Sequence, residues 1–185
     1  MIMTKNQIDE FFKLMENTSS TKRNNIRSIF LERIGEHIIE FCEKYYYKTS
    51  KAAFRNDLLR FVIRYAQSNK DATNFAVKAL NDKSKTVRES AIAVIANSLD
   101  KNLITVLNDK KNCLKGNETD IENAINAIMK ENHHLYYPKH DTWHITKDDL
   151  NRHLNLNQYH EDIHLYINKH APELVNPITK IIENQ

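Results

Sequence analysis

The sequence predicts an all-α protein, and three observations support this fold class. First, the 185 residues include only 2 glycines and 3 prolines, which sheets and elaborate loops need at their turns. Second, apolar residues recur at helical spacing through most of the chain. Third, short polar runs separate these amphipathic segments. We therefore expect one all-helical domain over residues 1–185, with N-terminal helices in 1–48, repeated helix pairs in 49–132, and a loop plus C-terminal helices in 133–185.

The N-terminal part predicts two amphipathic helices. Thr4 is placed to cap the first of them, and residues 17–20 form a polar break after it. A long second helix is expected to reach about Tyr47, with its tyrosines 45–47 at the edge of the core or, alternatively, on a docking surface. The apolar stripe of the first helix consists of Ile8, Phe11, Phe12 and Met15. The stripe of the second consists of Ile26, Ile29, Phe30, Ile34, Ile38, Phe41, Cys42 and Tyr45.

The stretch 80–99 predicts the end of one helix, a tight polar turn and a second amphipathic helix. Ser84 is an N-cap candidate, because its hydroxyl can accept a free backbone N–H of the first helical turn. One face of the following helix is apolar, and small residues would let a neighbouring helix approach closely. This face carries Val87, Ala91, Val94, Ile95 and Leu99, and the small residues are Ala91, Ala93 and Ala96.

A period of 33 residues relates this stretch to its neighbours in the sequence. Residues one period earlier align with this stretch: Phe54-Arg55 aligns with Val87-Arg88, and the apolar residues of 58–62 align with those of 91–95. Residues one period later also align: the apolar residues of 124–128 match those of 91–95, but this copy has no Val-Arg pair. The tripeptide Leu107-Asn108-Asp109 repeats Leu80-Asn81-Asp82 only 27 residues on, which predicts about six extra residues in that turn. The expected helices are 50–68, 70–81, 84–98, 101–114 and 119–131.

On these residues the stretch 80–99 resembles a HEAT repeat, and the resemblance extends more weakly over residues 49–132. It implies a short HEAT-like α-solenoid of antiparallel helix pairs. In that family the residues matching Asp82 and Arg88 form hydrogen bonds from one repeat to the next. The resemblance therefore implies a stacking role for Asp82, Val87 and Arg88, and for Arg55 one period earlier.

The helical periodicity ends at residues 132–145, where Pro138 is incompatible with a continuous helix. This expected loop is rich in histidine and aromatic residues, including the only tryptophan, Trp143. Helices are expected to resume at about 146–155 and 157–169. A last helix is expected to begin at Pro172, and Pro177 could kink or divide it.

Charge is distributed unevenly, and this asymmetry predicts the chemistry of a partner. Residues 1–92 hold 17 Lys and Arg against 11 Asp and Glu, whereas residues 118–162 hold 9 acidic against 4 basic residues. Aromatic anchors among acidic groups suit a basic protein partner. The predicted partner-binding residues are Tyr136, Tyr137, Asp141, Trp143, Asp148, Asp149, Tyr159, Glu161 and Asp162. The alternative for Tyr137 and Trp143 is a cap over the end of the repeat core.

One sequence motif could form a catalytic metal site. The sequence His160-Glu161-Asp162-Ile163-His164 matches H-E-x-x-H, in which two histidines on one helix face bind zinc and the glutamate activates water. No strand pattern supplies the sheet on which such sites are built, so we expect neither a metal, nor a cofactor, nor catalysis. The zinc-dependent hydrolase remains a third hypothesis. Cys42 and Cys113 are expected to be reduced, structural thiols.

Basic side chains of the first half could instead form a phosphate-binding groove of the kind found in HEAT-like DNA glycosylases. These residues are Lys22, Arg23, Arg27, Arg33, Lys51, Arg55, Arg60 and Arg64. Acidic residues interrupt them along the helices, so a nucleic-acid-binding protein is the second hypothesis.

The first hypothesis is a non-catalytic protein-binding module. In size, composition and charge the chain resembles small bacterial toxin-immunity proteins, which implies that it neutralises a basic, nuclease-type toxin by covering its active site. Residues 1–5 contain no apolar signal core and no window approaches a membrane span, so the expected location is the cytoplasm, without membrane contact.

Overall fold

The computed structural model describes residues 3–23, 34–111, 113–136 and 172–183, which are helical with intervening turns and contain no strand. The all-α fold class is therefore confirmed for this part of the chain. Two compact units are present, one comprising residues 1–37 with 142–185 and the other comprising residues 38–141. The expected organisation as a single domain stays a prediction.

The first unit contains α1 (Lys5–Glu16) and α11 (Val175–Glu183), which pack against each other. A capping box starts α1: the Thr4 hydroxyl accepts the backbone N–H of Gln7, whose side chain accepts the backbone N–H of Thr4. The predicted apolar stripe of α1 is buried. The short helix η4 (Pro172–Leu174) leads into α11, and Pro177 lies in the first turn of α11 without dividing it. A proline is tolerated there because first-turn N–H groups have no intrahelical acceptor.

The prediction of one uninterrupted helix reaching Tyr47 is wrong. Gly35 has φ +62°, a left-handed conformation that glycine adopts without the steric cost of a Cβ. The short helix η1 (Gly35–His37) follows, and α3 starts only at Ile38 and ends at Lys48. The apolar stripe nevertheless persists, with Ile34, Ile38, Phe41, Cys42 and Tyr45 all buried. Its members Ile26, Ile29 and Phe30 lie outside the described residues.

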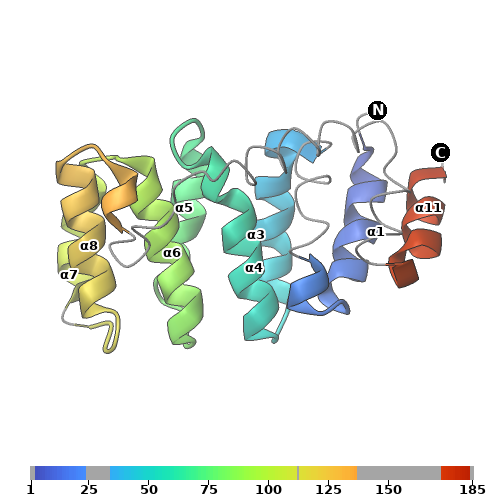
Figure 1. The fold of residues 1–185 in the computed structure, drawn as a ribbon, viewed down its shortest axis with the longest axis horizontal. Coiled ribbons are helices and arrows are strands. Elements are labelled where there is room, and N and C mark those ends of the chain that lie inside the picture. The colour runs from blue at the N-terminus through green and yellow to red at the C-terminus, as the bar shows by residue number, and fades with distance from the viewer. Residues whose placement is uncertain (1–2, 24–33, 112, 137–171, 184–185) are drawn as a thin grey trace, which may run out of the picture. The chain divides into compact units, whose positions relative to one another are not determined.

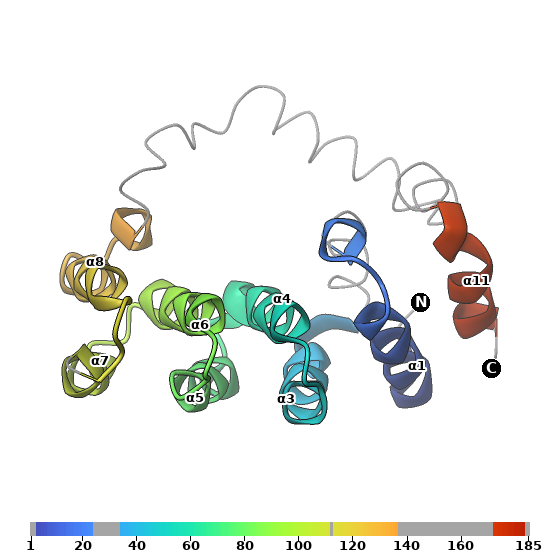
Figure 2. The ribbon, with the colours of Figure 1, turned by 90° about the horizontal axis from the view of Figure 1, so that it is seen from below.

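The second unit consists of successive helix pairs (Figure 1). Its elements are α3, α4 (Ala52–Val62), η2 (Ile63–Tyr65), α5 (Lys70–Ala79), α6 (Lys85–Ser98), α7 (Leu103–Lys111), α8 (Glu118–Met129) and η3 (His133–Tyr136). Within this unit α4, α6 and α8 form one row and α3, α5 and α7 a second row, as Figure 2 shows. The helices of each pair pack together, and α6 also packs against both α4 and α8.

The core of the second unit follows the 33-residue period predicted from the sequence. Phe54 on α4 and Val87 on α6 are fully buried, as are the apolar residues that follow each at matching positions. These are Leu58, Leu59, Phe61 and Val62 on α4, and Ala91, Ile92, Val94 and Ile95 on α6. On α8 the third copy buries Ala124, Ala127 and Ile128, whereas Ile125 is half-buried. Of the aromatic end of α3, Tyr45 and Tyr46 are buried and Tyr47 is 63% exposed.

Ser84 is the N-cap residue of α6, as predicted, but its hydroxyl makes no capping hydrogen bond and lies 3.0 Å from the Thr86 hydroxyl. The predicted repeat of the turn at 80–82 is wrong. The segment 107–109 does not repeat the turn at 80–82, because it lies inside α7. Within the described residues, no helix combines the length and the apolar character that a membrane span requires.

Candidate functional site

Three turns lie next to one another in the second unit, and two arginines join them. The turns contain residues 49–51, 80–84 and 113–117, and we call them together the turn edge. Each turn connects the two helices of one pair, so the amino ends of α4, α6 and α8 all lie at this edge (Figure 1). The arginines are Arg55 on α4 and Arg88 on α6.

Arg55 bridges the first and second turns. Its Nη1 donates to the carbonyl oxygens of Thr49 and Ser50 at 3.3 and 2.9 Å. Its Nε and Nη2 donate to the two carboxylate oxygens of Asp82 at 2.7 and 3.1 Å. This paired geometry is the strong form of an arginine–carboxylate contact, and both side chains are buried, with 7% and 5% of their surface exposed.

Arg88 repeats the same arrangement between the second and third turns. Its Nη1 donates to the carbonyl oxygens of Asp82 and Lys83 at 3.0 and 3.2 Å, which are again the residues six and five positions before the arginine. Its Nε donates to Asn117 Oδ1 at 2.9 Å, and its Nη2 to the carbonyl oxygen of Lys115 at 3.2 Å. The two arginines thus use equivalent atoms one sequence period apart.

The two bridges differ in charge. Asp82 presents a carboxylate to Arg55, whereas Asn117 presents a neutral amide to Arg88. Burial alone would raise the pKa of Asp82, but hydrogen bonds from Arg55, Tyr46 and the Ser84 backbone N–H hold it below its usual value. The Tyr46 hydroxyl donates to Asp82 Oδ2 at 2.6 Å, and burial together with this hydrogen bond raises the pKa of Tyr46. The Arg55 bridge is therefore an ionised, neutralised network, and the Arg88 bridge retains its positive charge.

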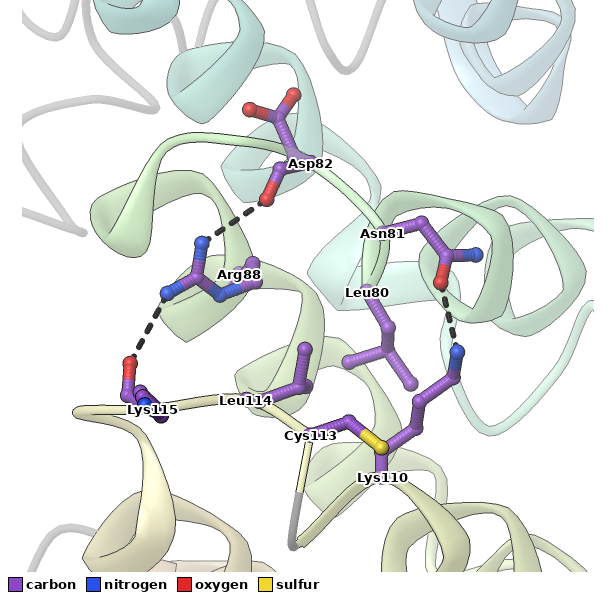
Figure 3. A pocket seen from close by; sticks show the side chains of 8 residues that line it. All are labelled: Leu80, Asn81, Asp82, Arg88, Lys110, Cys113, Leu114 and Lys115. Atoms are coloured by element: carbon purple, nitrogen blue, oxygen red, sulfur yellow. Dashed lines mark hydrogen bonds between the residues drawn. The ribbon is translucent and has the colours of Figure 1, made fainter.

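An open pocket lies beside Arg88, between the second and third turns (Figure 3). Its volume is about 430 Å³. Arg88 and Lys115 lie on one side and Lys110 on the other, and the Lys110 ammonium donates to Asn81 Oδ1 at 2.7 Å. The complete lining is Leu80, Asn81, Asp82, Arg88, Lys110, Cys113, Leu114 and Lys115.

The stacking residues implied by the HEAT resemblance come together here, and one partner differs from the expectation. Arg55, Asp82 and Arg88 form the bridges, and Val87 is fully buried beneath them. Asp109 was the expected counterpart of Asp82, but Asn117 accepts the hydrogen bond from Arg88. Neither Asn117 nor Tyr46 was predicted from the sequence to take part in these bridges. The one available signal was that Asn117 is a polar residue just before the apolar run of α8, where a capping side chain is favoured.

The predicted partner-binding residues are almost all beyond the described part of the chain. Tyr136 is the exception: it lies in η3, is 8% exposed, and donates its hydroxyl to the Glu89 carbonyl oxygen at 3.2 Å. It therefore packs against the helices of the second unit. The others lie outside the described residues, namely Tyr137, Asp141, Trp143, Asp148, Asp149, Tyr159, Glu161 and Asp162.

The structure bears differently on the predicted zinc motif, the predicted phosphate-binding groove and the two cysteines. The motif from His160 to His164 lies outside the described residues, and the remainder that the structure describes holds no group of three or more potential metal ligands. The proposed phosphate-binding groove loses two members. Arg55 is bound to Asp82, and Arg23 is buried and donates to the Met15 carbonyl oxygen. Cys42 is buried and Cys113 is exposed, and neither forms a disulfide.

We compared the chain with protein-family models, with curated proteins and with solved structures, and none of them matches.

Proposed function

We propose that this chain is a non-catalytic protein-binding module, and that its residues 38–136 form a HEAT-like α-solenoid. The observation that carries the proposal is the repeated arginine bridge. Arg55 and Arg88 lie 33 residues apart and donate to equivalent carbonyl oxygens of their own turns and to a polar side chain of the next turn. Such a repeated bridge keeps successive helix pairs in register.

Repeat proteins of this kind bind partners through the extended surface that stacked helix pairs create. The two rows of helices in residues 38–136 leave outer faces, because helices such as α5 and α8 bury the side that meets their neighbours and expose the other (Figure 2). Rigid stacking also favours binding, since less conformational entropy is lost when a partner docks. A scaffold role is thus the simplest use of this architecture.

As the partner we propose a basic, nuclease-type bacterial toxin domain whose active site the chain covers. Support comes from the sequence: residues 118–162 hold 9 acidic against 4 basic residues, together with the tryptophan at position 143. Opposite charge on two partners accelerates their encounter and disfavours wrong partners. The chain would then act in the cytoplasm as an immunity protein.

The test is affinity purification of the tagged chain from native lysate, followed by calorimetric titration with the captured protein. We expect a basic protein, and we expect the double variant Asp148→Asn/Asp149→Asn and the variant Trp143→Ala each to weaken binding at least about tenfold. Asp71→Asn/Asp109→Asn is the matched control, because both aspartates are exposed on helices of the second unit. An acidic partner, or equal affinity of all variants, would refute this proposal.

One observation favours nucleic-acid binding as a second function. Exposed lysines follow the turn edge and its helix ends, namely Lys48, Lys51, Lys83, Lys85 and Lys115. Phosphate contacts by such residues make affinity fall steeply as salt increases. Titration of labelled single- and double-stranded oligonucleotides between 50 and 200 mM salt (on the order of the range over which such contacts are lost) tests it. Binding that is absent, or insensitive to salt, excludes this function.

A further inference from the structure

The pocket beside Arg88 carries positive charge that the described residues do not neutralise. Arg88 donates only to neutral acceptors, which are the Asn117 amide oxygen and three backbone carbonyl oxygens. Lys110 likewise donates to an amide oxygen, that of Asn81. Lys115 is exposed, and no carboxylate of the described residues pairs with it. Three cationic side chains therefore line one hollow.

The single carboxylate in the lining does not offset this charge. Both oxygens of Asp82 are bound on the other side, by the Arg55 guanidinium and the Tyr46 hydroxyl. Figure 3 shows the carboxylate directed away from Arg88, with only its backbone carbonyl oxygen facing that residue. The corresponding position in the next turn is Asn117, which brings no charge of its own; its Nδ2 donates to Asp120 Oδ2 at 3.1 Å, so that carboxylate is bound to the amide and not to Arg88. The pocket thus lacks the counter-ion that the equivalent arginine one period earlier possesses.

The geometry favours a compact, doubly charged anion over a carboxylate. Four of the five N–H groups of Arg88 are already used in the bridge, so the planar fork that binds a carboxylate in a bidentate manner is not free. The positive charge of Arg88 still attracts an anion in the pocket, and the ammonium groups of Lys110 and Lys115 can bind phosphate as point charges. Between the two cationic sides lie Cys113, which is exposed, and the edge of Leu114, which is 8% exposed, and these two side chains offer a small apolar surface to an organic group.

We propose that this pocket binds the terminal phosphate of a small phosphate monoester, with the ester's organic part over Cys113 and the exposed edge of Leu114. A volume of about 430 Å³ lies in the range of small-molecule sites. A phosphate monoester carries a charge close to −2 at neutral pH, which matches a site with several cations better than a phosphodiester with a single charge. This binding activity is separate from the proposed protein-binding function and does not depend on it.

The experiment is calorimetric titration of the full chain with phenyl phosphate, at constant ionic strength. Inorganic phosphate lacks the phenyl ring, so its affinity compared with that of phenyl phosphate measures the contribution of the apolar surface. A short single-stranded oligonucleotide without terminal phosphate carries only phosphodiesters, so its affinity shows whether the site accepts a singly charged phosphate group. We expect phenyl phosphate to bind more tightly than inorganic phosphate, and the oligonucleotide to bind at this site at least about tenfold more weakly. The variant Lys110→Gln/Lys115→Gln should weaken phenyl phosphate binding at least about tenfold.

Two variants make the test specific. Lys101→Gln/Lys130→Gln removes the same charge from exposed lysines outside the pocket lining and should bind like the wild type. The double variant Asn117→Asp/Asp120→Asn places a carboxylate on Arg88, as Asp82 does on Arg55. The second change is needed because Asn117 Nδ2 donates to Asp120 Oδ2 at 3.1 Å, and two carboxylates there would repel each other. This variant should weaken binding while circular dichroism reports an unchanged helix content. The proposal is overturned if phenyl phosphate does not bind, if the two lysine double variants lose equal affinity, or if the oligonucleotide depends on Lys110 and Lys115 more strongly than phenyl phosphate does.

Discussion

Substitution of Asp82 by alanine tests the bridge on which the repeat architecture depends. The change removes four hydrogen-bond donations to the carboxylate, which come from Arg55 Nε and Nη2, the Tyr46 hydroxyl and the Ser84 backbone N–H. It also leaves the Arg55 guanidinium buried without a counter-ion, since its side chain is only 7% exposed. Breaking a buried ion pair from one side typically costs about 3–5 kcal/mol. We expect a loss of unfolding free energy in that range.

Asparagine at the same position should be less harmful, and the chain itself supplies the reason. Arg88 already donates to an asparagine, Asn117, in the equivalent place. Asp82→Asn keeps the shape and one acceptor oxygen, but its NH2 group takes the place of an oxygen that accepts two hydrogen bonds, and Arg55 loses its counter-ion. Leaving such donors without an acceptor costs about 1–3 kcal/mol, which is less than the loss of all four hydrogen bonds. The order of stability is therefore wild type, Asp82→Asn, Asp82→Ala.

At acidic pH the wild type should also lose its higher free energy of unfolding relative to Asp82→Asn. The pKa of Asp82 is lowered in the folded state, so its ionised form stabilises the protein above the unfolded-state pKa of about 4. As the pH falls through the lower, folded-state pKa, this contribution is lost. The difference in stability between the two proteins is expected to shrink below about pH 4 and to stay constant between pH 5 and pH 7, roughly the window above that pKa.

Urea unfolding followed by circular dichroism at each pH measures these differences. Glu43→Gln is the control, because it breaks an exposed contact between α3 and Lys78 and should leave the transition almost unchanged. Asp82→Ala within about 0.5 kcal/mol of the wild type would refute the reasoning, since this is the range of neutral surface changes. Equal stability of the alanine and asparagine variants would show that the carboxylate position contributes no hydrogen bonding.

Three further predictions concern the remaining described residues. Ile95→Ala, in the fully buried face of α6, should cost about 2–5 kcal/mol by urea unfolding. Thr4→Ala should cost about 1 kcal/mol because it removes the capping box of α1, whereas Ser84→Ala should cost less, since that hydroxyl caps no backbone N–H. In Ellman's assay the exposed Cys113 should react in the native protein, and Cys42 only after unfolding, because burial raises the pKa of its thiol.

The candidate site could be predicted from the sequence only in part. The sequence identified three of its residues: the 33-residue period aligns Arg55 with Arg88, and the HEAT resemblance implied the roles of Asp82 and Arg88. It did not identify Tyr46, whose hydroxyl reaches Asp82 from a helix 36 residues earlier in the chain. It also matched Leu107-Asn108-Asp109 to Leu80-Asn81-Asp82, but that tripeptide lies inside α7, and the acceptor of the Arg88 hydrogen bond is Asn117.

The sequence by itself determined the helical class, the capped start of α1, and the apolar faces of α4 and α6 one period apart. These features depend on interactions within a few residues and on the period of 3.6 residues per turn, both of which are visible in one dimension. Only the tertiary structure decided that Asn117 meets Arg88 and that Arg88 remains without a carboxylate. Both depend on which segments, distant in the chain, lie side by side, and no local pattern encodes that.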